Sequence, residues 1–530
     1  MTNLNWTRAY RQTLATALAF AWLSALPLSA QQARATQQQT LTTPQPPPQG
    51  ETLRLAMTDA VAMGLEQNLG LKADRLDVDV AAMSVASSKS AYLPQLTSRF
   101  FRNSGKSVPS DFTQGLSDIT SRGLNLTATY AQLMPWYGGN YSVSWQGNRN
   151  DQVGGISSFN PRLTSSLSLS FTQPLMEGFK IDSQRFGVQS SERRRSIADL
   201  TLQARIVQTE VQIKNAYLGL IAAVEGRKVA QQNMDVLQKT LEQAKARVAV
   251  GQSPQIDVIQ AEAQVLSGRE SLISADAFIA TAEDTLRQLI LDPNRPDYWT
   301  VHLEATDAIQ LTPFQVDVDA AIKNALANRI DLIQFKQNMQ ITELQMDLNK
   351  NLTKPTMDFQ ASYSAQGTGG TQFQFGSGFP PEVLGRADRS FGSALSDTFL
   401  GAYPSWSVGF FLAYPLGQTG ARVAVAQTQV AQRQQEMDLK NLELAIVRDV
   451  REAARQVRNS YERVQAAVAA RESSETQLRA VDRQFEVGLA TTLDQQVRQQ
   501  QLASALNREL TAKLDYNRAL INLERAQKIQ

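Results

Sequence analysis

The chain lacks cysteine altogether and has a single histidine, His302, among its 530 residues. The absence of cysteine excludes disulfides, a thiol nucleophile, a thiolate metal site and a lipidated cysteine as a membrane tether. One histidine between Val301 and Leu303 is too little for acid–base work, and the sequence has neither a glycine-rich phosphate loop nor a metal-ligand cluster. The sequence therefore predicts no enzyme, no cofactor and no metal site.

Long apolar runs are also scarce. One stretch, Thr13–Leu28, follows Arg8 and Arg11 and ends close to Ala30, which is the pattern of a secretory signal peptide. A membrane anchor is the alternative, but the run is short of the roughly 20 apolar residues that a spanning helix needs. We expect residues 1–30 to be a cleaved signal peptide. If the exported chain enters a membrane, it must do so as strands closed into a barrel.

Neither charge sign predominates. The chain has 52 basic and 50 acidic residues, and removal of residues 1–30 takes away two arginines and no acid, which leaves 50 of each. Nothing in this balance indicates a nucleic-acid partner. Residues 31–50, rich in Gln, Thr and Pro, predict a disordered or extended tether.

What the chain does contain is an internal repeat. The interval from Ala60 to Pro94 is 34 residues, and so is the interval from Ala321 to Pro355; in each copy a helical pattern leads to a strand. The first of these helices is expected from about Met57 to Tyr92. We therefore expect two repeats, residues 51–300 and 301–530, each with a helix, strands and a long helical hairpin.

The predicted strands alternate with a period of two, which separates an apolar face from a polar face. In the first half the apolar row interleaves with small polar residues, and a similar row recurs in the second half: Leu163, Leu167, Leu169, Phe171; Trp406, Val408, Phe410, Leu412, Tyr414. Such strands fit either a soluble sandwich or a membrane barrel with lipid outside and water inside. In the barrel interpretation one set of side chains is expected to face lipid: Leu167, Leu169, Phe171, Phe410 and Leu412. Ser168, Ser170 and Gly409 are expected to face the lumen or neighbouring strands. The stretches Gly105–Gly123 and Gly367–Tyr403 are predicted to be long surface loops.

Two long helical runs follow the strands. The first extends from about Ile181 to Val250 without proline, and both runs carry apolar residues at heptad-like spacing. Seventy helical residues extend about 105 Å, far longer than a globular domain, so we expect coiled-coil packing. The runs stop at Val250-Gly251 and at Val487-Gly488-Leu489, where glycine can close a helix. Second helices then return, giving two long antiparallel hairpins.

These motifs, in their order and twice over, resemble the TolC-like outer membrane efflux proteins. The resemblance covers essentially the whole chain after the signal peptide and rests on the following segments: Ala91-Tyr92-Leu93-Pro94-Gln95, Phe171-Thr172-Gln173-Pro174-Leu175, Asn215-Ala216-Tyr217, Val250-Gly251 through Asp257-Val258, and Val487-Gly488-Leu489 through Asp494.

The resemblance implies an α+β membrane protein. Its expected form is a homotrimer whose outer-membrane β-barrel, embedded in the lipid bilayer, continues into a long periplasmic α-helical barrel. Typical members contribute four strands per protomer. This chain departs from that number, because residues 124–145 form an additional hairpin-like segment. Whether that segment enlarges the barrel or folds outside it is left open at this stage.

The function implied is that of a passive conduit in a tripartite efflux or type I secretion system, joined to an inner-membrane transporter by a periplasmic adaptor protein. The resemblance marks Asp494, with Asp257 as its counterpart, as candidates for the periplasmic gate; a role at the helix N-terminus is the alternative. Where some relatives carry a second aspartate, this chain has Val497. Candidates for the adaptor-docking tips are Val250, Gly251, Val487, Gly488 and Leu489. The alternative is that the two glycines only terminate their helices.

Two other function classes remain open on the sequence. An exported structural coiled coil or adhesin would explain the helices but not the alternating strands. A stand-alone porin would explain the strands but not two helical runs of about seventy residues. Ion conductance in a planar bilayer separates a conduit from an adhesin, and dependence of export on a partner pump separates it from a porin.

Overall fold

The computed structural model describes residues 52–109, 118–154, 156–309, 311–313, 315–378, 381–414, 416–417, 419–487 and 489–527. The predicted signal peptide, the predicted tether and Gly488 lie outside these residues.

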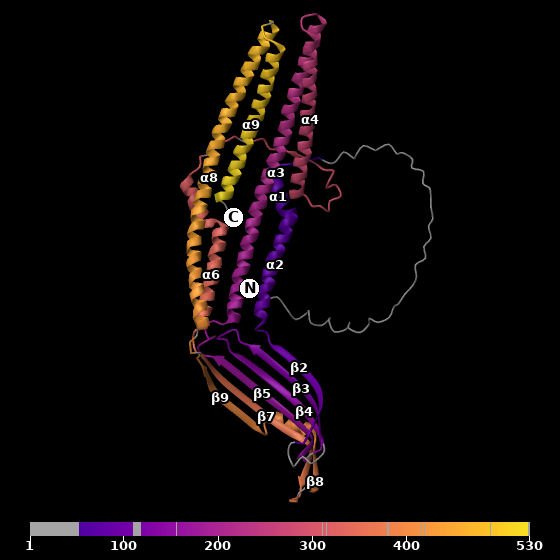
Figure 1. The fold of residues 1–530 in the computed structure, drawn as a ribbon, viewed down its shortest axis with the longest axis vertical. Coiled ribbons are helices and arrows are strands. Elements are labelled where there is room, and N and C mark those ends of the chain that lie inside the picture. The colour runs from indigo at the N-terminus through magenta and orange to yellow at the C-terminus, as the bar shows by residue number, and fades with distance from the viewer. Residues whose placement is uncertain are drawn as a thin grey trace, which may run out of the picture. The chain divides into compact units, whose positions relative to one another are not determined.

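The two long helical hairpins have nearly the same dimensions. The outgoing helices are α3 (Ser183–Ala249, 67 residues) and α8 (Thr419–Glu486, 68 residues). The returning helices, α4 (Gln255–Ile290) and α9 (Thr492–Gln527), have 36 residues each. α3 packs along α4 and α8 packs along α9, and Figure 1 shows both hairpins reaching away from the strands. The structure thus confirms the predicted hairpins.

Shorter helix pairs precede the strands in each half. The first pair is α1 (Met57–Gln67) and α2 (Leu69–Ser90); the second is α5 (Val318–Asn328) and α6 (Ile330–Asn351). Both pairs have 11 and 22 residues, and both break at one residue between the helices.

The single helix expected from Met57 to Tyr92 is therefore wrong. Asn68 leaves the helical conformation, with ψ at 121°. Its side chain accepts a hydrogen bond from the Leu71 amide at 3.2 Å and donates one to the Leu289 carbonyl of α4, also at 3.2 Å. Asparagine side chains compete in this way with the backbone hydrogen bonds of a helix. The Asn68 side chain therefore caps the start of α2 and also attaches the break to α4.

The strands form two sheets. A small parallel pair joins β1 (Thr52–Leu55) to β6 (His302–Ala305). The large sheet has the order β2-β3-β4-β5-β7-β8, with β9 also paired to β7, and its pairings are antiparallel. Its strands are β2 (Gln95–Ser107), β3 (Ile119–Leu133), β4 (Asn140–Val153), β5 (Phe159–Pro174), β7 (Thr356–Phe375), β8 (Val383–Arg389) and β9 (Pro404–Ala413).

The additional segment at residues 124–145 belongs to this sheet. It contributes β3 and β4, which lie between β2 and β5 rather than outside the sheet. The turn that joins them rests on the end of β5 and on the segment that leads into α3: the Tyr137 ring stacks on Phe179 at 4.8 Å, and the Gln173 amide donates to the Tyr137 carbonyl at 2.7 Å.

The first predicted surface loop is wrong at its two ends, with residues 110–117 outside the described part of the chain, and the second is wrong for much of its length. β2 continues to Ser107 and β3 begins at Ile119, within the stretch Gly105–Gly123. The stretch Gly367–Tyr403 contains the end of β7, all of β8 and helix α7 (Phe391–Phe399). Gly, Ser and Asp favour loops in general, but an antiparallel partner satisfies backbone N–H and C=O groups whatever the side chains are.

The segment between the halves packs against the middle of α3. The buried Tyr217 hydroxyl donates to the Leu55 carbonyl of β1 at 2.8 Å and lies 3.2 Å from the Asp307 carboxylate, just after β6. Around it a core joins the hairpin to the small sheet: Ile213, Leu220, Leu286, Ile290, Val301 and Leu303. Across the part of the chain that the structure describes, no helix is long and apolar enough to cross a membrane.

Candidate functional site: the two-faced sheet and the hairpin tips

The large sheet separates apolar from hydroxyl-bearing side chains in rows that cross six strands. One row of paired residues is apolar throughout: Leu96, Tyr130, Val143, Leu169, Tyr363 and Trp406. The neighbouring row carries only hydroxyl side chains: Thr97, Thr129, Ser144, Ser168, Ser364 and Ser405. Because successive side chains on a strand point to opposite faces, these rows lie on opposite faces of the sheet. The alternation predicted for β5 and β9 is confirmed, and it extends through β3 and β4.

Hydroxyls on the polar face bond to one another across neighbouring strands. Ser142 and Ser170 are 2.7 Å apart at their Oγ atoms, and Ser362 and Ser407 are 2.7 Å apart in the same row. All four side chains are at least partly exposed. A water-facing surface of this kind carries many weak hydrogen-bonding groups and few fixed charges.

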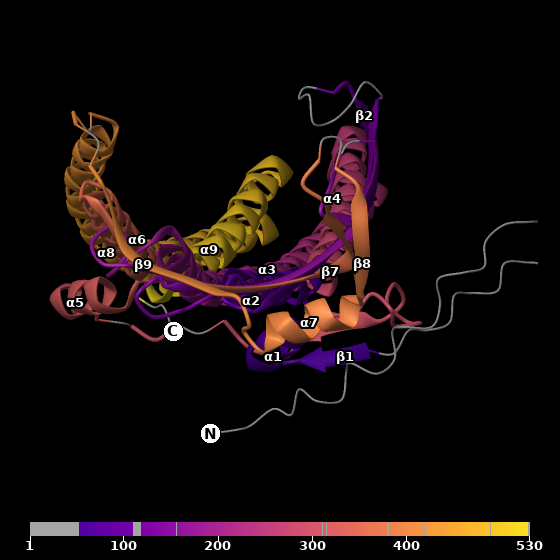
Figure 2. The same cartoon turned by 90° about the horizontal axis from the view of Figure 1, so that it is seen from below.

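Helix α7 covers the far end of the apolar face. Gly367 and Gly369 lie on the same face as Tyr363, and their missing Cβ atoms leave room for the α7 backbone: a Cβ on Gly367 would stand 1.9 Å from the Ala394 carbonyl oxygen. The Thr398 hydroxyl donates to the Ser165 carbonyl of β5 at 2.9 Å. Figure 2 shows the sheet as a curved surface with α7 against its convex side. The apolar face is therefore convex, and the hydroxyl face is concave.

Between the helical end and α7, the apolar face is left uncovered. On β7 this band runs from Met357 to Tyr363, and the next residue on that face, Ala365, is buried. On β9 the large side chains of the band are mostly exposed: Trp406, Val408, Phe410 and Leu412. The predicted lipid-facing residues Leu167, Leu169 and Phe171 lie on this face of β5.

The first hairpin tip is a complete helix stop. Gly251 has a φ of +75°, which L-residues other than glycine rarely adopt. Its N–H donates to the Val248 carbonyl at 3.0 Å, and the next N–H, of Gln252, donates to the Arg247 carbonyl at 2.9 Å. These two bonds define a Schellman motif. Val250, just before the glycine, is 68% exposed.

The second tip repeats the outer of these bonds. The Leu489 N–H donates to the Gln484 carbonyl at 2.8 Å, across the same number of residues as Gln252 to Arg247. Val487 therefore corresponds to Val250, and Leu489 corresponds to Gln252. Val487 is 69% exposed and Leu489 is 81% exposed. Both tips thus present valine to solvent, and the second adds a leucine where the first has a glutamine.

The two candidate gate aspartates stand in the same place after each tip but bond differently. Asp494 and Thr491 form a reciprocal capping pair: the Asp494 carboxylate accepts from the Thr491 hydroxyl at 2.7 Å and from its N–H at 3.0 Å, and the Asp494 N–H donates to the Thr491 hydroxyl. The Thr491 hydroxyl and N–H hold the pKa of Asp494 below its usual value. Asp257 follows Pro254, which has no hydroxyl to offer, and only its backbone N–H bonds back to the Pro254 carbonyl.

Two of the contacts between the hairpins lie close to the tips. Arg247 in the last turn of α3 places its guanidinium carbon 3.7 Å from the Phe485 ring centroid, and its Nη2 donates to the Phe485 carbonyl at 3.1 Å. Two turns further from the tip, the Gln499 amide of α9 donates to the Thr240 hydroxyl of α3 at 3.2 Å. No sequence pattern identified these residues in advance. The one feature that could have indicated the contact is the lone aromatic residue Phe485 beside the second tip.

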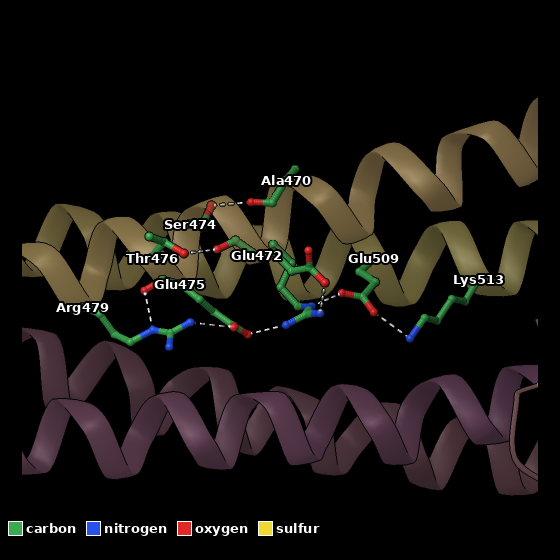
Figure 3. A network of polar contacts seen from close by, with 9 residues as sticks. Ala470, Glu472, Ser474, Glu475, Thr476, Arg479, Glu509 and Lys513 are labelled. Atoms are coloured by element: carbon green, nitrogen blue, oxygen red, sulfur yellow. Dashed lines mark hydrogen bonds and ion pairs between the residues drawn. The ribbon is translucent and has the colours of Figure 1, made fainter.

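A charged network lies within the second hairpin, between α8 and α9. Glu509 of α9 accepts from Arg471 Nε at 2.5 Å and lies 2.6 Å from Lys513 Nζ, while Arg471 also pairs with Glu475. Figure 3 shows Glu475, Glu509 and Lys513 on the side of the α8–α9 hairpin that faces the other helices. Burial alone would raise the pKa of Glu509, but Lys513 and Arg471 outweigh it and hold that pKa below its usual value.

Within the described residues, no group of three or more His, Asp or Glu side chains could hold a metal ion.

Comparisons with known proteins agree with this architecture. The profile of the family described as "Outer membrane efflux protein" matches residues 61–290 and 321–527. The chain is similar to the outer membrane efflux protein BepC of Brucella suis biovar 1 (strain 1330), with 22% identity over 443 residues, which are 83% of this chain and 77% of BepC.

Two solved structures show the same fold at low identity. CusC matches with a TM-score of 0.65 and 11% identity, over 89% of this chain and 92% of CusC. The Campylobacter jejuni outer membrane channel CmeC matches with a TM-score of 0.63 and 13% identity, over 89% of this chain and 85% of CmeC. Because the family profile covers most of both halves, the chain belongs to the outer membrane efflux protein family and is an efflux channel of the outer membrane.

Proposed function

We propose that this channel is the passive outer segment of a tripartite efflux or type I secretion system, and that it acts as a homotrimer. The observation that carries the proposal is the combination within one chain of a two-faced sheet and helical hairpins whose outgoing helices have 67 and 68 residues. At about 1.5 Å per residue these helices extend about 100 Å from the sheet. The sheet would close into a barrel in the bilayer, and the hairpins would form the periplasmic tunnel.

Cargo would cross this conduit without chemistry on the channel itself. Energy would come from an inner-membrane transporter, joined to the channel by a periplasmic adaptor. The hydroxyl rows on the concave face give the sheet a water-compatible lining without a fixed charge pattern that would select one cargo. The single most informative experiment measures export of a panel of compounds with the partner pump present and absent. Export that persists without the pump would support a stand-alone porin instead.

The adaptor would dock at the two hairpin tips. Val250, Val487 and Leu489 expose apolar surface at the ends of long helices, where an unpartnered tip gains nothing from it. The Gln252-to-Arg247 and Leu489-to-Gln484 hydrogen bonds span the same number of residues, so each protomer would offer two similar sites, one at each tip.

The matched tips supply a clean test of docking. Leu489→Gln gives the second tip the residue that the first tip already has at Gln252, so the turn itself stays intact. Docking at the tips requires normal trimer assembly together with loss of export and of adaptor crosslinking, most strongly when Leu489→Gln is combined with Val250→Gln. Full export by the combined variant would refute tip docking, and Gln252→Asn serves as the matched polar control.

The gate would lie just inside these tips, with Asp494 and Asp257 as candidates. Threefold symmetry would turn each aspartate into a ring. The capping pair between Asp494 and Thr491 gives this carboxylate a structural role as well, so the gate proposal depends on separating the two roles by mutation.

A further inference from the structure

The large sheet has two edges without a strand partner along much of their length. β2 at one end and β9 at the other each pair on one side only among the described strands. Every residue of β2 is exposed, and so are all but the last of β9. In a bilayer, an unpaired backbone N–H or C=O costs several kcal/mol, so edges of this length cannot stay open there.

We propose that β9 of one copy pairs with β2 of the next, and that three copies close a barrel of eighteen strands. The proposal rests on the homotrimer proposed above. It commits each edge to a second copy of this chain. The total of eighteen strands follows because each paired row crosses six strands in one copy, including the β3–β4 hairpin.

Strand direction supports this closure. Each neighbour along the path β2, β3, β4, β5, β7, β9 is antiparallel to the one before, so β9 runs opposite to β2. A β9 edge can therefore meet a β2 edge of another copy in an antiparallel pair, as bacterial barrels with even strand numbers require. β8 does not obstruct the contact, because it pairs with β7 from Gly370 onward, whereas β9 pairs with residues up to Ala365.

The side-chain rows also match across the proposed joint. The apolar row begins with Leu96 on β2 and ends with Trp406 on β9, and the hydroxyl row begins with Thr97 and ends with Ser405. Joining copies edge to edge would continue both faces around the barrel. The hairpin β3–β4 shares both rows, so it belongs to the same wall.

The hairpin widens the barrel without adding a helix. β2, β5, β7 and β9 each adjoin a long or short helix in the chain, whereas β3 and β4 are joined at the helical end by a tight turn against the segment that leads into α3. Since barrel diameter grows roughly in proportion to strand number, eighteen strands would give a barrel about 1.5 times as wide as twelve. The helical tunnel below would keep the same number of helices.

Cysteine pairs can test the joint directly, because the chain has no cysteine of its own. Two intramolecular controls lie in one row of the polar face: Ser362→Cys with Ser407→Cys, and Ser142→Cys with Ser170→Cys, each pair with Oγ atoms 2.7 Å apart. The test set combines Ser407→Cys with one cysteine at a time along the same face of β2, at positions 95, 97, 99, 101 and 103. The protein is oxidised in outer membranes and analysed by denaturing gel.

We expect a covalent trimer when Ser407→Cys is combined with a cysteine at one or two neighbouring positions of β2. Both intramolecular control pairs should also form their disulfides. Native mass measured without oxidation tests the trimer separately. A trimeric mass with no crosslink at any β2 position overturns the edge pairing alone, whereas another mass overturns the threefold assembly. A disulfide between Thr97→Cys on β2 and Ser168→Cys on β5 of one chain would show that β3–β4 leaves the wall, and it would overturn the eighteen-strand barrel.

Discussion

Arg247 and Phe485, which lie 238 positions apart in the sequence, join the two helical hairpins beside their tips. The guanidinium carbon is 3.7 Å from the ring centroid, and Nη2 donates to the Phe485 backbone carbonyl at 3.1 Å. Both residues lie in the last turns of their helices, one turn from the exposed valines. If the tunnel opens by separation of the hairpins, this contact has to break.

We expect Arg247→Ala to favour the open channel. A cation–π contact contributes about 0.5–1 kcal/mol at exposed sites, so its loss should shift the opening equilibrium by roughly two- to fivefold. Single-channel recording in planar bilayers measures this as open probability. Arg247→Lys is the matched control, because it keeps the charge but loses the flat guanidinium; its effect should be smaller. Unchanged opening in Arg247→Ala would show that the hairpins are held elsewhere.

The next prediction separates capping from gating at Asp494. Thr491→Ala removes the capping hydroxyl and leaves the carboxylate, whereas Asp494→Ala removes both functions of the side chain. A gate role predicts altered conductance or cation block in Asp494→Ala and normal conductance in Thr491→Ala. If both variants have the same conductance and only lower thermal stability, Asp494 acts as a helix cap and not as a gate. Asp257→Ala, at the uncapped counterpart, tests whether the first hairpin contributes to the gate.

The pH dependence of the Asp494 cap follows from the sign of its pKa shift. The Thr491 hydroxyl and N–H lower the pKa of the folded-state carboxyl. A depressed pKa means that the contribution to stability is complete above the ordinary aspartate pKa, near 4, and is lost as pH falls through the lower folded value. Thermal unfolding between pH 3 and 6 should show this loss in the native protein, and Thr491→Ala should reduce it.

How much of this could be read from the sequence depends on the range of the interactions. The strand alternation at Leu167, Leu169 and Phe171 is local, so a period of two identified both the strand and its faces. The helix stops at Gly251 and Val487 are also local, and glycine marks such stops well. The contact of Arg247 with Phe485 depends instead on how two hairpins align, and no local pattern carries that information.

The same distinction explains the missed helix α7. Helix α7 packs against Gly367 and Gly369 of β7. In isolation these glycines indicate a flexible loop rather than a strand that another backbone approaches closely. The break at Asn68 was missed for a related reason. Its amide bonds to the Leu289 carbonyl, 221 positions away, and no local sequence pattern indicates that contact.

The membrane band predicts opposite outcomes for neighbouring residues on β5. Leu169 lies in the apolar row with Tyr363 and Trp406, whereas Ser168 lies on the opposite face. An arginine on the lipid side near the midplane costs about 2–4 kcal/mol. Leu169→Arg should therefore reduce the amount of folded trimer in outer membranes, while Ser168→Arg should assemble and mainly change conductance. Equal, mild effects from both would favour a soluble sandwich.

Glu509 should contribute more to stability than Glu475, which also pairs with Arg471, because the Glu509 side chain is 11% exposed whereas that of Glu475 is 33% exposed. Glu509→Gln removes the charge that Arg471 and Lys513 share, and we expect a loss of about 1–3 kcal/mol in unfolding free energy. The lowered pKa of Glu509 means that this stabilisation is complete above about pH 5 and is lost as pH falls through the folded value. Glu475→Gln is the control, and a thermal shift as large as that of Glu509→Gln would contradict the ranking.

Two glycines on the sheet allow a matched test of α7 docking. A Cβ at Gly367 would stand 1.9 Å from the Ala394 carbonyl oxygen, which is backbone and cannot rotate away, whereas a Cβ at Gly409 on β9 would meet no heavy atom within 4 Å. Gly367→Ala should therefore displace α7 or strain β7, and it should lower the free energy of unfolding by about 1–3 kcal/mol. Gly409→Ala should change the free energy of unfolding by less than about 0.5 kcal/mol. Limited proteolysis on intact outer membranes detects release of α7 as faster cleavage after Arg386 or Arg389. Equal cleavage of the two variants would show that α7 does not depend on the Gly367 contact.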